Sequence, residues 1–415
     1  MHARHRVGMP VSAVAAAVVT LVVGGCAHSP LLVPAGPDYT FDGPMSEQVL
    51  ESYLSRAVSH QVLYTDSDPL LLADDIRMFT HIGAKFIGRA SIIWETPADL
   101  DAHFTTAAWI ADEAHAADPE IILQAGLFEI VDTAVNAVPV PEWVFEAFGL
   151  PVEERSYDYG AMLYEDGSSV DYFGPGSSIP DMSRLETRMW FYHRAGLYID
   201  AGYEAIHFGV VDAMAVNDPT HEHYADLLGR IRSYAQTNAR RHWVLCDTHH
   251  KTGWVCEGHT LFDFLSYPLR VQEGEGGALS GVLQVDAEDT IYGQTLGGIT
   301  PAGWEAPRLP YLVEFDNWGS SGQGGEDIGG IWVWGYDEID WFARLDGPSR
   351  DAWLSYAHDW VRDTDPYGHL QFPARRILAD PISQTCSWYF ANKPSGACEN
   401  GFDQENAMRA IWLTQ

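Results

Sequence analysis

The sequence predicts an α/β fold of the (β/α)8 TIM-type barrel class with a small C-terminal extension. Short apolar runs alternate with helical segments along the 415 residues, which is the pattern of a parallel sheet. Carboxylates or histidines follow these runs directly, and a barrel collects the carboxyl ends of its strands at one rim. No Gly-x-Gly-x-x-Gly or phosphate-binding loop follows any run, which argues against an open nucleotide-binding sheet.

The predicted strands are short apolar runs that end in polar residues. We expect them at 84–94, 120–131, 203–211, 241–247, 261–269, 308–314 and 331–334. Helical periodicity and end signals predict helices at 45–62, 70–82, 96–117, 142–148, 183–201, 218–238 and 348–361. Ser183 and Glu186 have the spacing of a capping box. The long irregular segment 150–182 inside this pattern indicates a functional insertion.

The N-terminus has the features of a targeting segment. Basic residues precede an apolar run at 11–23 that is too short to span a bilayer, and Gly24-Gly25-Cys26 follows. This segment resembles a bacterial lipobox, which implies removal of residues 1–25, lipidation of Cys26 and export to the cell envelope. An ordinary secretory signal with a coincidental cysteine is the alternative. Ala27 after the cysteine fits sorting to the outer membrane by resemblance alone.

The remaining chain divides into three predicted parts. Residues 26–45 are rich in Pro and Gly and form a tether, 46–365 form the barrel domain, and 366–415 form a C-terminal extension packed on it. The formal net charge of −34 argues against nucleic acid and anionic lipid as partners. With 46% hydrophobic residues the chain can bury a large core. No cofactor is predicted, and the oligomeric state stays open.

Four cysteines remain beyond Cys26, and they fall into two close pairs. In an oxidising compartment we expect disulfides between Cys246 and Cys256 and between Cys386 and Cys398. A zinc site is the alternative, but nine and eleven intervening residues do not match the spacing of zinc ligands.

Acidic and aromatic residues cluster after the two late strands. Burying a carboxylate at the end of a core strand is costly without a purpose. A sugar suits such a cluster, because its apolar face stacks on a ring while its hydroxyls bond to carboxylates. The residues concerned are Glu314, Asp316, Asn317 and Trp318 after the first run, and Trp334, Tyr336, Asp337 and Glu338 after the second.

This arrangement resembles the (β/α)8-barrel glycoside hydrolases. Leu312-Val313-Glu314-Phe315 is similar to their late-strand glutamate, and Ile331-Trp332-Val333-Trp334 to their last strand with its platform tryptophan. The resemblance implies an acid/base carboxyl and a nucleophile at the ends of two different strands. No Asn-Glu pair ends a middle strand, so the position of the acid stays open.

Two carboxyl groups about 5 Å apart are needed for retention of configuration, or ~6.5–9.5 Å apart for inversion. We assign Glu314 and Asp212 as the catalytic pair, with Glu129 in reserve. The predicted substrate-binding residues are Trp318, Trp334, Tyr336, Asp337, Glu338, Asp316, Asn317, Asp247, His249, His207, Trp94 and Glu95. For any single carboxylate, a salt bridge or a helix N-cap is the alternative role.

Histidines near the strand ends raise the possibility of a metal site. His249 and His250 follow Asp247, but a catalytic metal needs three convergent ligands and an open position. His221 and His223 are two residues apart, so they point apart on a helix. We predict no metal. The functional hypotheses are therefore an envelope-anchored glycoside hydrolase, a non-catalytic glycan-binding lipoprotein on the same scaffold, or a metal-dependent hydrolase.

Overall fold

The computed structural model describes residues 36–63, 68–278 and 280–414. The chain divides into two units, Met1–Gly36 and Pro37–Gln415, and the second of these forms the body. The predicted signal peptide and Cys26 lie outside the described residues. Within the described ranges, no helix combines the length and the apolar character that a bilayer span requires.

A seven-stranded sheet forms the larger part of the core. Its order is β16-β15-β1-β2-β3-β6-β7, and every neighbouring pair is parallel except β15 with β16. The fold is therefore mixed α/β with a largely parallel sheet, which confirms the coarse fold class. The strands are β1 (Ala57–His60), β2 (Phe86–Ile92), β3 (Ile122–Gly126), β6 (Ala205–His207), β7 (Leu245–Asp247), β15 (Phe372–Ile377) and β16 (Trp388–Phe390).

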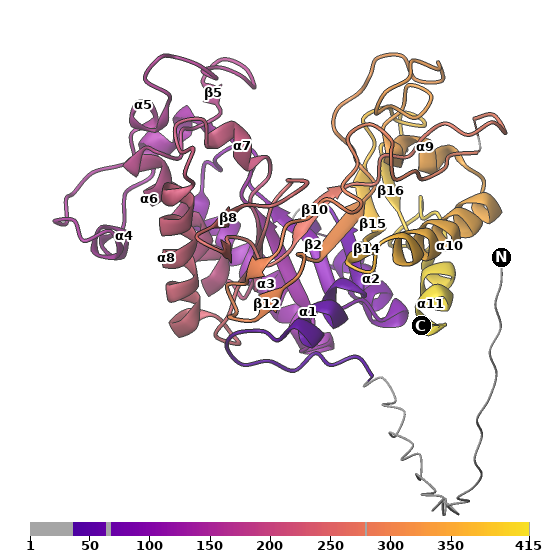
Figure 1. Cartoon of the computed structure of the whole chain (residues 1–415), viewed down its shortest axis with the longest axis horizontal. Helices are drawn as coiled ribbons and strands as arrows, with labels where there is room; N and C mark the ends of the chain where they lie inside the picture. The colour runs from indigo at the N-terminus through magenta and orange to yellow at the C-terminus, as the bar shows by residue number, and fades with distance from the viewer. Residues whose placement is uncertain (1–35, 64–67, 279, 415) are drawn as a thin grey trace, which may run out of the picture. The chain divides into compact units, whose positions relative to one another are not determined.

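A separate three-stranded parallel sheet contacts the first one at two places. It contains β10 (Leu265–Pro268), β13 (Tyr311–Glu314) and β14 (Gly368–Leu370), in that order. An isolated parallel bridge joins His249, just beyond β7, to Ser266 of β10. Gln371 is the one residue between β14 and β15, and its N–H donates to the Val313 carbonyl at 2.8 Å. Strands of both sheets lie together in the middle of Figure 1.

Helices separate most of the parallel strands along the chain and flank the sheets in Figure 1. The side chains of Asp68, Asp99 and Asp346 cap the N-termini of α2, α3 and α10, which satisfies amide groups that have no helical partner. The helices are α1 (Glu47–Leu54), α2 (Pro69–Ile82), α3 (Leu100–Ala117), α4 (Glu142–Ala147), α5 (Tyr159–Met162), α6 (Leu185–Asp200), α7 (Val211–Met214), α8 (Glu222–Asn238), α9 (Glu338–Arg344), α10 (Gly347–Thr364) and α11 (Glu405–Leu413), with a 3-10 helix at Thr133–Ala137.

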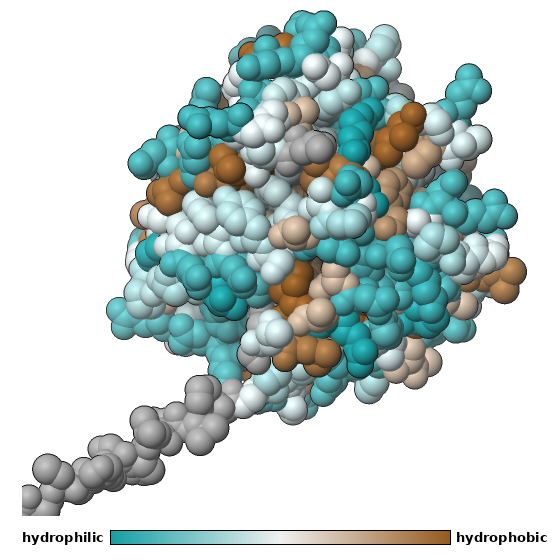
Figure 2. All heavy atoms as spheres, turned by 90° about the vertical axis from the view of Figure 1, so that its right-hand side faces the viewer, coloured by the Kyte–Doolittle hydropathy of each residue, from teal (hydrophilic) through white to brown (hydrophobic). Residues whose placement is uncertain are grey.

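Short strand pairs decorate the connecting segments. The long insertion after β3 carries β4 (Val131–Asp132) and β5 (Ser177–Ser178), which pair with each other. The connections around β10 contain no α-helix and instead carry a small sheet of β8 (Val255–Cys256), β9 (His259–Thr260), β11 (Gly298–Ile299) and β12 (Glu305–Ala306). In Figure 2, hydrophilic residues cover most of the face seen from the right of Figure 1, and hydrophobic residues gather there only in small patches.

Alternate residues of the parallel strands form two layers of side chains. The first layer packs with α1 as one apolar cluster, in which the Phe86 and Phe264 rings lie 5.6 Å apart. Side chains two positions apart on a strand point to the same side, so a second layer lies nearer the carboxyl ends. The first layer is Ala57, Phe86, Ile122, Ala205, Leu245, Phe264 and Leu312. The second layer is Ser59, Gly88, Gln124, His207, Asp247, Ser266 and Glu314.

Six of the strand predictions are confirmed, and one is wrong. The predicted ranges 84–94, 120–131, 203–211, 241–247, 261–269 and 308–314 contain β2, β3, β6, β7, β10 and β13. Residues 331–334 form no strand; Val333 only bridges to Tyr336 in a tight turn, where Gly335 has a φ of +77°. The strand that follows β13 in space comes instead from residues 368–377, within the range that we expected to form a C-terminal extension.

Two helix predictions also need correction. The segment 45–62 is helical only to Leu54, because Ala57–His60 enters the sheet as β1. Ser183 and Glu186 form no capping box: Arg184 is the N-cap of α6, and the Glu186 carboxylate binds the guanidinium of Arg155 at 2.7 and 3.0 Å. Residues 38–45, expected as part of the tether, contact the body; Gly43 N–H, for example, donates to the Arg241 carbonyl at 2.9 Å.

The predicted disulfides are not formed. Cys246 is a buried thiol in β7, and Cys256 is a thiol whose Sγ lies 3.4 Å from the Thr220 carbonyl. Cys386 is also a free thiol, so it makes no bridge with Cys398. The closeness of Cys246 and Cys256 in sequence did not predict a disulfide, because Cys246 lies in β7 of the seven-stranded sheet and Cys256 lies in β8 of the small four-stranded sheet.

A substitution at Gly88 tests the tight packing between β2 and Gln371, which links β14 to β15. A Cβ at Gly88 would lie 2.2 Å from Gln371 Nε2 and 3.2 Å from Gln124 Oε1. We expect Gly88→Ala to lower the free energy of unfolding by about 1–3 kcal/mol through overpacking. The matched control is Gly229→Ala in α8, where nothing lies within 4 Å; it should leave stability unchanged or raise it. Urea unfolding measures both, and equal stabilities would contradict the packing described.

Candidate functional site

The centre of the candidate site is the carboxylate of Glu314 at the carboxyl end of β13. Arg89 from β2 binds it with both Nε, at 3.1 Å, and Nη2. Arg376 from β15 donates from Nη1 at 2.9 Å, and His249 Nε2 lies 3.1 Å from Oε1. We call these four residues the Glu314 clamp. Glu314 and Arg376 side chains are each only 2% exposed, so the clamp lies largely beneath the surface.

The charge state of Glu314 follows from its neighbours. Burial alone would raise the pKa of this carboxyl, but Arg89 and Arg376, with a hydrogen bond from His249, outweigh it. The pKa of Glu314 therefore lies well below its usual range, and the group is ionised at neutral pH. An ionised carboxylate enclosed in this way can orient cations and histidines but has no proton to donate.

Arg89 reaches Glu314 from an unusual backbone conformation. Its φ is +61°, the left-handed region, and the pairing register between β2 and β3 shifts between Ile87 and Ser91. A non-glycine residue in this region is strained, and such strain persists only where the surroundings fix it. Here the Arg89 amide donates to Gln124 Oε1 at 3.0 Å, and its carbonyl accepts from Val62 N–H at 3.0 Å.

Two histidines and Asp247 adjoin the clamp. Asp247, at the end of β7, binds His207 Nδ1 at 2.8 Å and accepts from Gln124 Nε2 at 2.7 Å and from the Ser266 hydroxyl. Nε2 of His207 is buried and has no hydrogen-bond partner among the described residues. The His207 and His249 rings meet edge to face at 4.8 Å.

Exposed aromatic rings flank the clamp on two sides. On one side, Trp94 is 46% exposed and packs on Phe128, and the Arg89 guanidinium lies 5.5 Å from the centre of the Phe128 ring. On the other side, Arg376 Nη2 donates to Asn317 Oδ1 at 2.6 Å, and the next residue, Trp318, is 66% exposed. Trp318 stacks against Trp332 at 6.4 Å with 14° between the ring planes.

A second ionic group follows β10 and β13. Arg270 binds Asp289 at 2.7 Å and Asp316 at 3.3 Å, and Lys251 also binds Asp289, at 3.0 Å. Arg270 is another non-glycine residue with a left-handed backbone, at φ +58°. The Tyr267 hydroxyl donates to Asp289 at 2.8 Å, and its ring lies 6.3 Å from His249, which joins this group to the clamp.

The other two predicted catalytic carboxylates lie near the same ends of the strands. Asp212, in α7, is 59% exposed and pairs with His250 Nε2 at 3.3 Å; this contact lowers the pKa of Asp212. His250 is the chain neighbour of His249, but no contact joins Asp212 to a clamp residue among the described residues. Glu129 Oε2 accepts from the Val210 amide at 2.9 Å. Its close approach leaves no room for a side chain at Gly209, where a Cβ would lie 2.1 Å from Oε2.

Asp337 and Glu338 occupy a buried acidic cluster at the start of α9. Glu338 accepts from the amides of Val271 and Asp316, both at 2.9 Å, so it ties two loops together. Burial raises the pKa of Glu338 to about 7. Burial, reinforced by Asp340 and Asp316, raises the pKa of Asp337 to about 9, so Asp337 is protonated at neutral pH.

The remaining predicted site residues lie at other places in the loops. Trp334 has a φ of +45° and its amide donates to Glu273 Oε1 at 2.8 Å. The Tyr336 ring lies 4.0 Å from the guanidinium carbon of Arg344. Glu95 is exposed next to Trp94.

Sequence reasoning missed Arg89 and Arg376, which surround Glu314. A signal for both exists in the sequence. Phe-Ile-Gly-Arg-Ala-Ser-Ile is a buried strand with one charged residue, and Phe-Pro-Ala-Arg-Arg-Ile carries Arg375 and Arg376 in a similar position. A charge inside a buried apolar strand requires a partner, and Glu314 is that partner.

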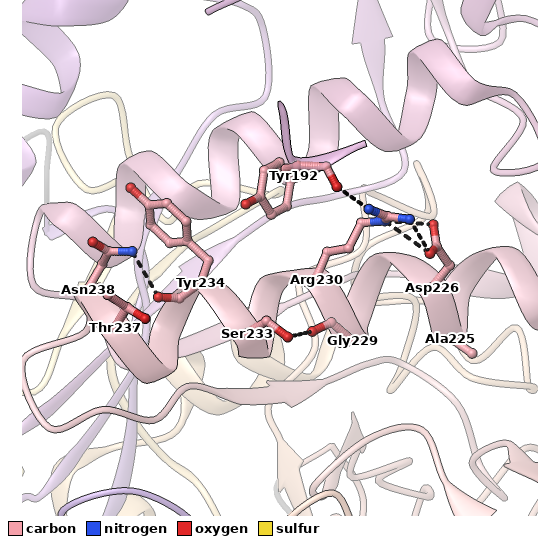
Figure 3. A pocket seen from close by; sticks show the side chains of 10 residues that line it. Tyr192, Ala225, Asp226, Gly229, Arg230, Ser233, Tyr234, Thr237 and Asn238 are labelled. Carbon is pink, nitrogen blue, oxygen red and sulfur yellow. Dashed lines mark hydrogen bonds and ion pairs between the residues drawn. The ribbon is translucent and has the colours of Figure 1, made fainter. Parts of the chain in front are cut away.

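A surface hollow lies away from these residues. It has a volume of about 690 Å³ and runs along α8 beside Tyr192 and Ala147 (Figure 3). Its polar side chains already bond locally: Arg230 with Asp226, Ser233 with the Gly229 carbonyl, and Asn238 with the Tyr234 carbonyl. None of its lining residues is a predicted site residue. Among the described residues, no three His, Cys, Asp or Glu side chains converge so that they could hold a metal ion.

The buried acids of α9 predict how stability depends on pH. A carboxyl whose pKa is raised on folding stabilises the native state in its protonated form, and this contribution is lost as pH rises through the native pKa. With native pKa values of about 7 for Glu338 and about 9 for Asp337, the contribution of these two groups to the free energy of unfolding should fall from about pH 5 to pH 9.

Asp337→Asn should make this fall shallower, because the amide stays neutral. The control is Asp363→Asn, whose side chain is 73% exposed and should leave the profile unchanged. Urea unfolding at several pH values measures the effect. A difference in stability between the wild type and Asp337→Asn that does not change with pH across this range would contradict the assignment.

Comparisons with known proteins give no family. No protein-family model matches this chain, and no curated protein matches it. The acarbose-soaked debranching enzyme of Nostoc punctiforme is similar in structure with a TM-score of 0.44 and 10% identity, over 90% of this chain and 82% of that chain. Eubacterium rectale Amy13B gives 0.43 and 11%, over 86% and 78%. The α-galactosidase TtGalA of Thermus thermophilus gives 0.31 and 13%, over 55% and 47%.

These likenesses are distant. The alignment with the native form of the same Nostoc punctiforme enzyme has a TM-score of 0.33 and spans only 53% of that chain.

Proposed function

We propose that this chain is a carbohydrate-active protein of the glycoside hydrolase type, which binds a sugar above the Glu314 clamp. The observation that carries the proposal is the series of contacts that runs from the exposed Trp94 through Phe128 and Arg89 to Glu314, and from there through Arg376 to Asn317. The exposed Trp318 is the next residue in the chain after Asn317. Rings on both sides of a charged centre suit a ligand with apolar faces and many hydroxyls.

We infer that the two parallel sheets form one ring of the (β/α)8 type. The bridge between His249 and Ser266 supports the closure on one side, and Gln371, between β14 and β15, supports it on the other. Contacts between strands that are not neighbours support it further. Arg89 on β2 binds Glu314 on β13, and Gln124 on β3 binds Asp247 on β7. In such a ring the second layer faces inward, below the proposed sugar site.

The charge states of Glu314 and Asp212 limit the catalytic roles that these two predicted residues can take. A glycosidase needs one carboxyl group that can donate a proton and one that is ionised. The pKa values of Glu314 and Asp212 are both lowered, by the arginines and by His250 respectively. Both groups therefore suit the nucleophilic or electrostatic role, and the acid has to be a different group. Glu129, held at the Val210 amide, stays the reserve candidate.

A non-catalytic glycan-binding protein is the second candidate. The burial of Glu314, whose side chain is 2% exposed, favours it, because a nucleophile has to reach the sugar. For both candidates we propose that Cys26 carries a lipid that anchors the mature chain to the bacterial envelope, outer membrane or surface. Mass spectrometry of the mature N-terminus tests this part: a mature chain without lipid at Cys26 would contradict it.

A screen of chromogenic glycosides and of plant, algal and bacterial polysaccharides tests the function. Cleavage by the wild type would support the hydrolase, and binding without cleavage would support the second candidate. Trp318→Ala should weaken binding about three- to tenfold through loss of one stacking surface. Leu70→Ala in α2, at an equally exposed position of 69%, should change nothing.

Asp212→Asn should abolish turnover without unfolding the protein, since the side chain is 59% exposed. Full activity of this variant would remove Asp212 from the catalytic pair. A wild type that neither binds nor cleaves any member of the screen would contradict the proposed function as a whole.

A further inference from the structure

We propose that Nδ1 of His249 is the hydrogen-bond acceptor that the Glu314 clamp presents to a sugar hydroxyl. This inference rests on the proposed function and deepens it, because it names the atom that contacts the ligand and the kind of ligand group that it recognises. Its support comes from the contacts of the ring, from the exposure of the clamp and from the charges around it.

The contacts of Nε2 determine which ring nitrogen carries the proton. His249 Nε2 lies 3.1 Å from Glu314 Oε1 and 2.8 Å from Arg89 Nη2. If Nε2 accepted from Arg89, its lone pair would face the carboxylate oxygen, and two acceptors would repel each other. Arg89 already donates to Glu314 from Nε and Nη2. With Nε2–H as the donor, Arg89 Nη2 is a second donor 2.8 Å away, but the charge-assisted bond from Nε2–H to the ionised carboxylate outweighs this contact between donors, and Nδ1 then carries the lone pair.

The exposure of the clamp favours His249 as its contact with a ligand. Its side chain is 18% exposed, against 9% for Arg89 and 2% for both Glu314 and Arg376. Nδ1 makes no hydrogen bond with any residue that the structure describes, whereas Nε2 is engaged. His249 is therefore the member of the clamp that is most accessible to a ligand.

The ring is fixed from several sides, so its lone pair has a defined direction. The backbone N–H of His249 donates to the Gly209 carbonyl at 2.9 Å. The His207 ring packs on it at 75° and the Tyr267 ring at 66°. A preoriented acceptor binds a hydroxyl with little loss of side-chain freedom.

The surrounding charges keep the ring neutral. The groups that face it are Arg89 from β2, His207 from β6, Tyr267 from β10 and Glu314 from β13. Burial lowers the pKa of His249; the hydrogen bond to Glu314 opposes this, and Arg89 and His207 reinforce it. A neutral imidazole keeps its lone pair at pH 7, so affinity for the sugar should fall as pH drops and Nδ1 becomes protonated.

Nitrogen NMR of the full-length protein labelled with 15N-histidine tests the proton position. We expect the His249 signals at pH 7 to show an unprotonated Nδ1 and a protonated Nε2, assigned by their loss in His249→Gln. A protonated Nδ1 at pH 7, in either the other tautomer or the imidazolium, would overturn the proposal.

Titration of the same sample with the methyl glycosides of glucose, galactose, mannose and xylose tests the ligand contact. We expect at least one to shift the Nδ1 signal. In His249→Gln the amide takes the position of Nε2 and keeps the bond to Glu314, but the Nδ1 acceptor is gone. This variant should keep the wild-type free energy of unfolding and bind the same glycoside about five- to tenfold more weakly.

The matched control is His369→Gln in β14, which replaces a histidine that binds Glu51 and is 17% exposed. It should bind the glycoside as the wild type does. If a glycoside binds and His249→Gln has unchanged affinity, the inference fails while the proposed function stands. If none of the four glycosides shifts the signal and none of the wider screen binds, both fail.

Discussion

The interaction on which the site depends is the buried ion pair between Glu314 and two arginines. Each charged group alone would be unstable in this position, because removal from water costs several kcal/mol per ion. Together they satisfy one another, and they tie β2, β13 and β15 at their carboxyl ends. The cluster carries one net positive charge when His249 is neutral, in contrast to the chain as a whole with its net charge of −34. An electron-rich oxygen of a ligand is therefore favoured there.

The position of the clamp follows from the alternation of the strands. Each strand places an apolar side chain in the first layer and a small or polar one two residues later, as Leu312 and Glu314 illustrate. Apolar packing against α1 supplies the stability of the lower layer, and hydrogen bonds organise the upper one. A polar layer of this kind specifies a single arrangement only if nearly every member is paired, and the bonds around Asp247 meet that condition.

Much of the fold and part of the site could be predicted from the sequence. Strands such as 203–211 were recognisable because apolar runs ended at acids or turn residues, and Glu314 stood out as an acid at the end of one of them. Arg89 and Arg376 were missed because their partner lies 225 positions from Arg89 and 62 from Arg376. A pattern within a few residues of the sequence cannot indicate a contact between residues so far apart in the chain. The segment 331–334 was wrongly predicted as a strand because its local sequence favours one: its tryptophans have strong strand propensity. In the structure, Gly335 and the left-handed backbone of Trp334 form a turn there instead.

Glu314 stays ionised within its clamp because Arg89 and Arg376 hold its pKa well below the usual range. Carbon NMR of the side-chain carboxyl of Glu314, assigned with Glu314→Gln and followed from pH 8 downward, measures this directly. We expect the chemical shift of a carboxylate at every pH at which the protein stays folded. A titration of Glu314 in the folded protein near the usual pKa of a glutamate, or above it, would show that the two arginines do not keep it ionised.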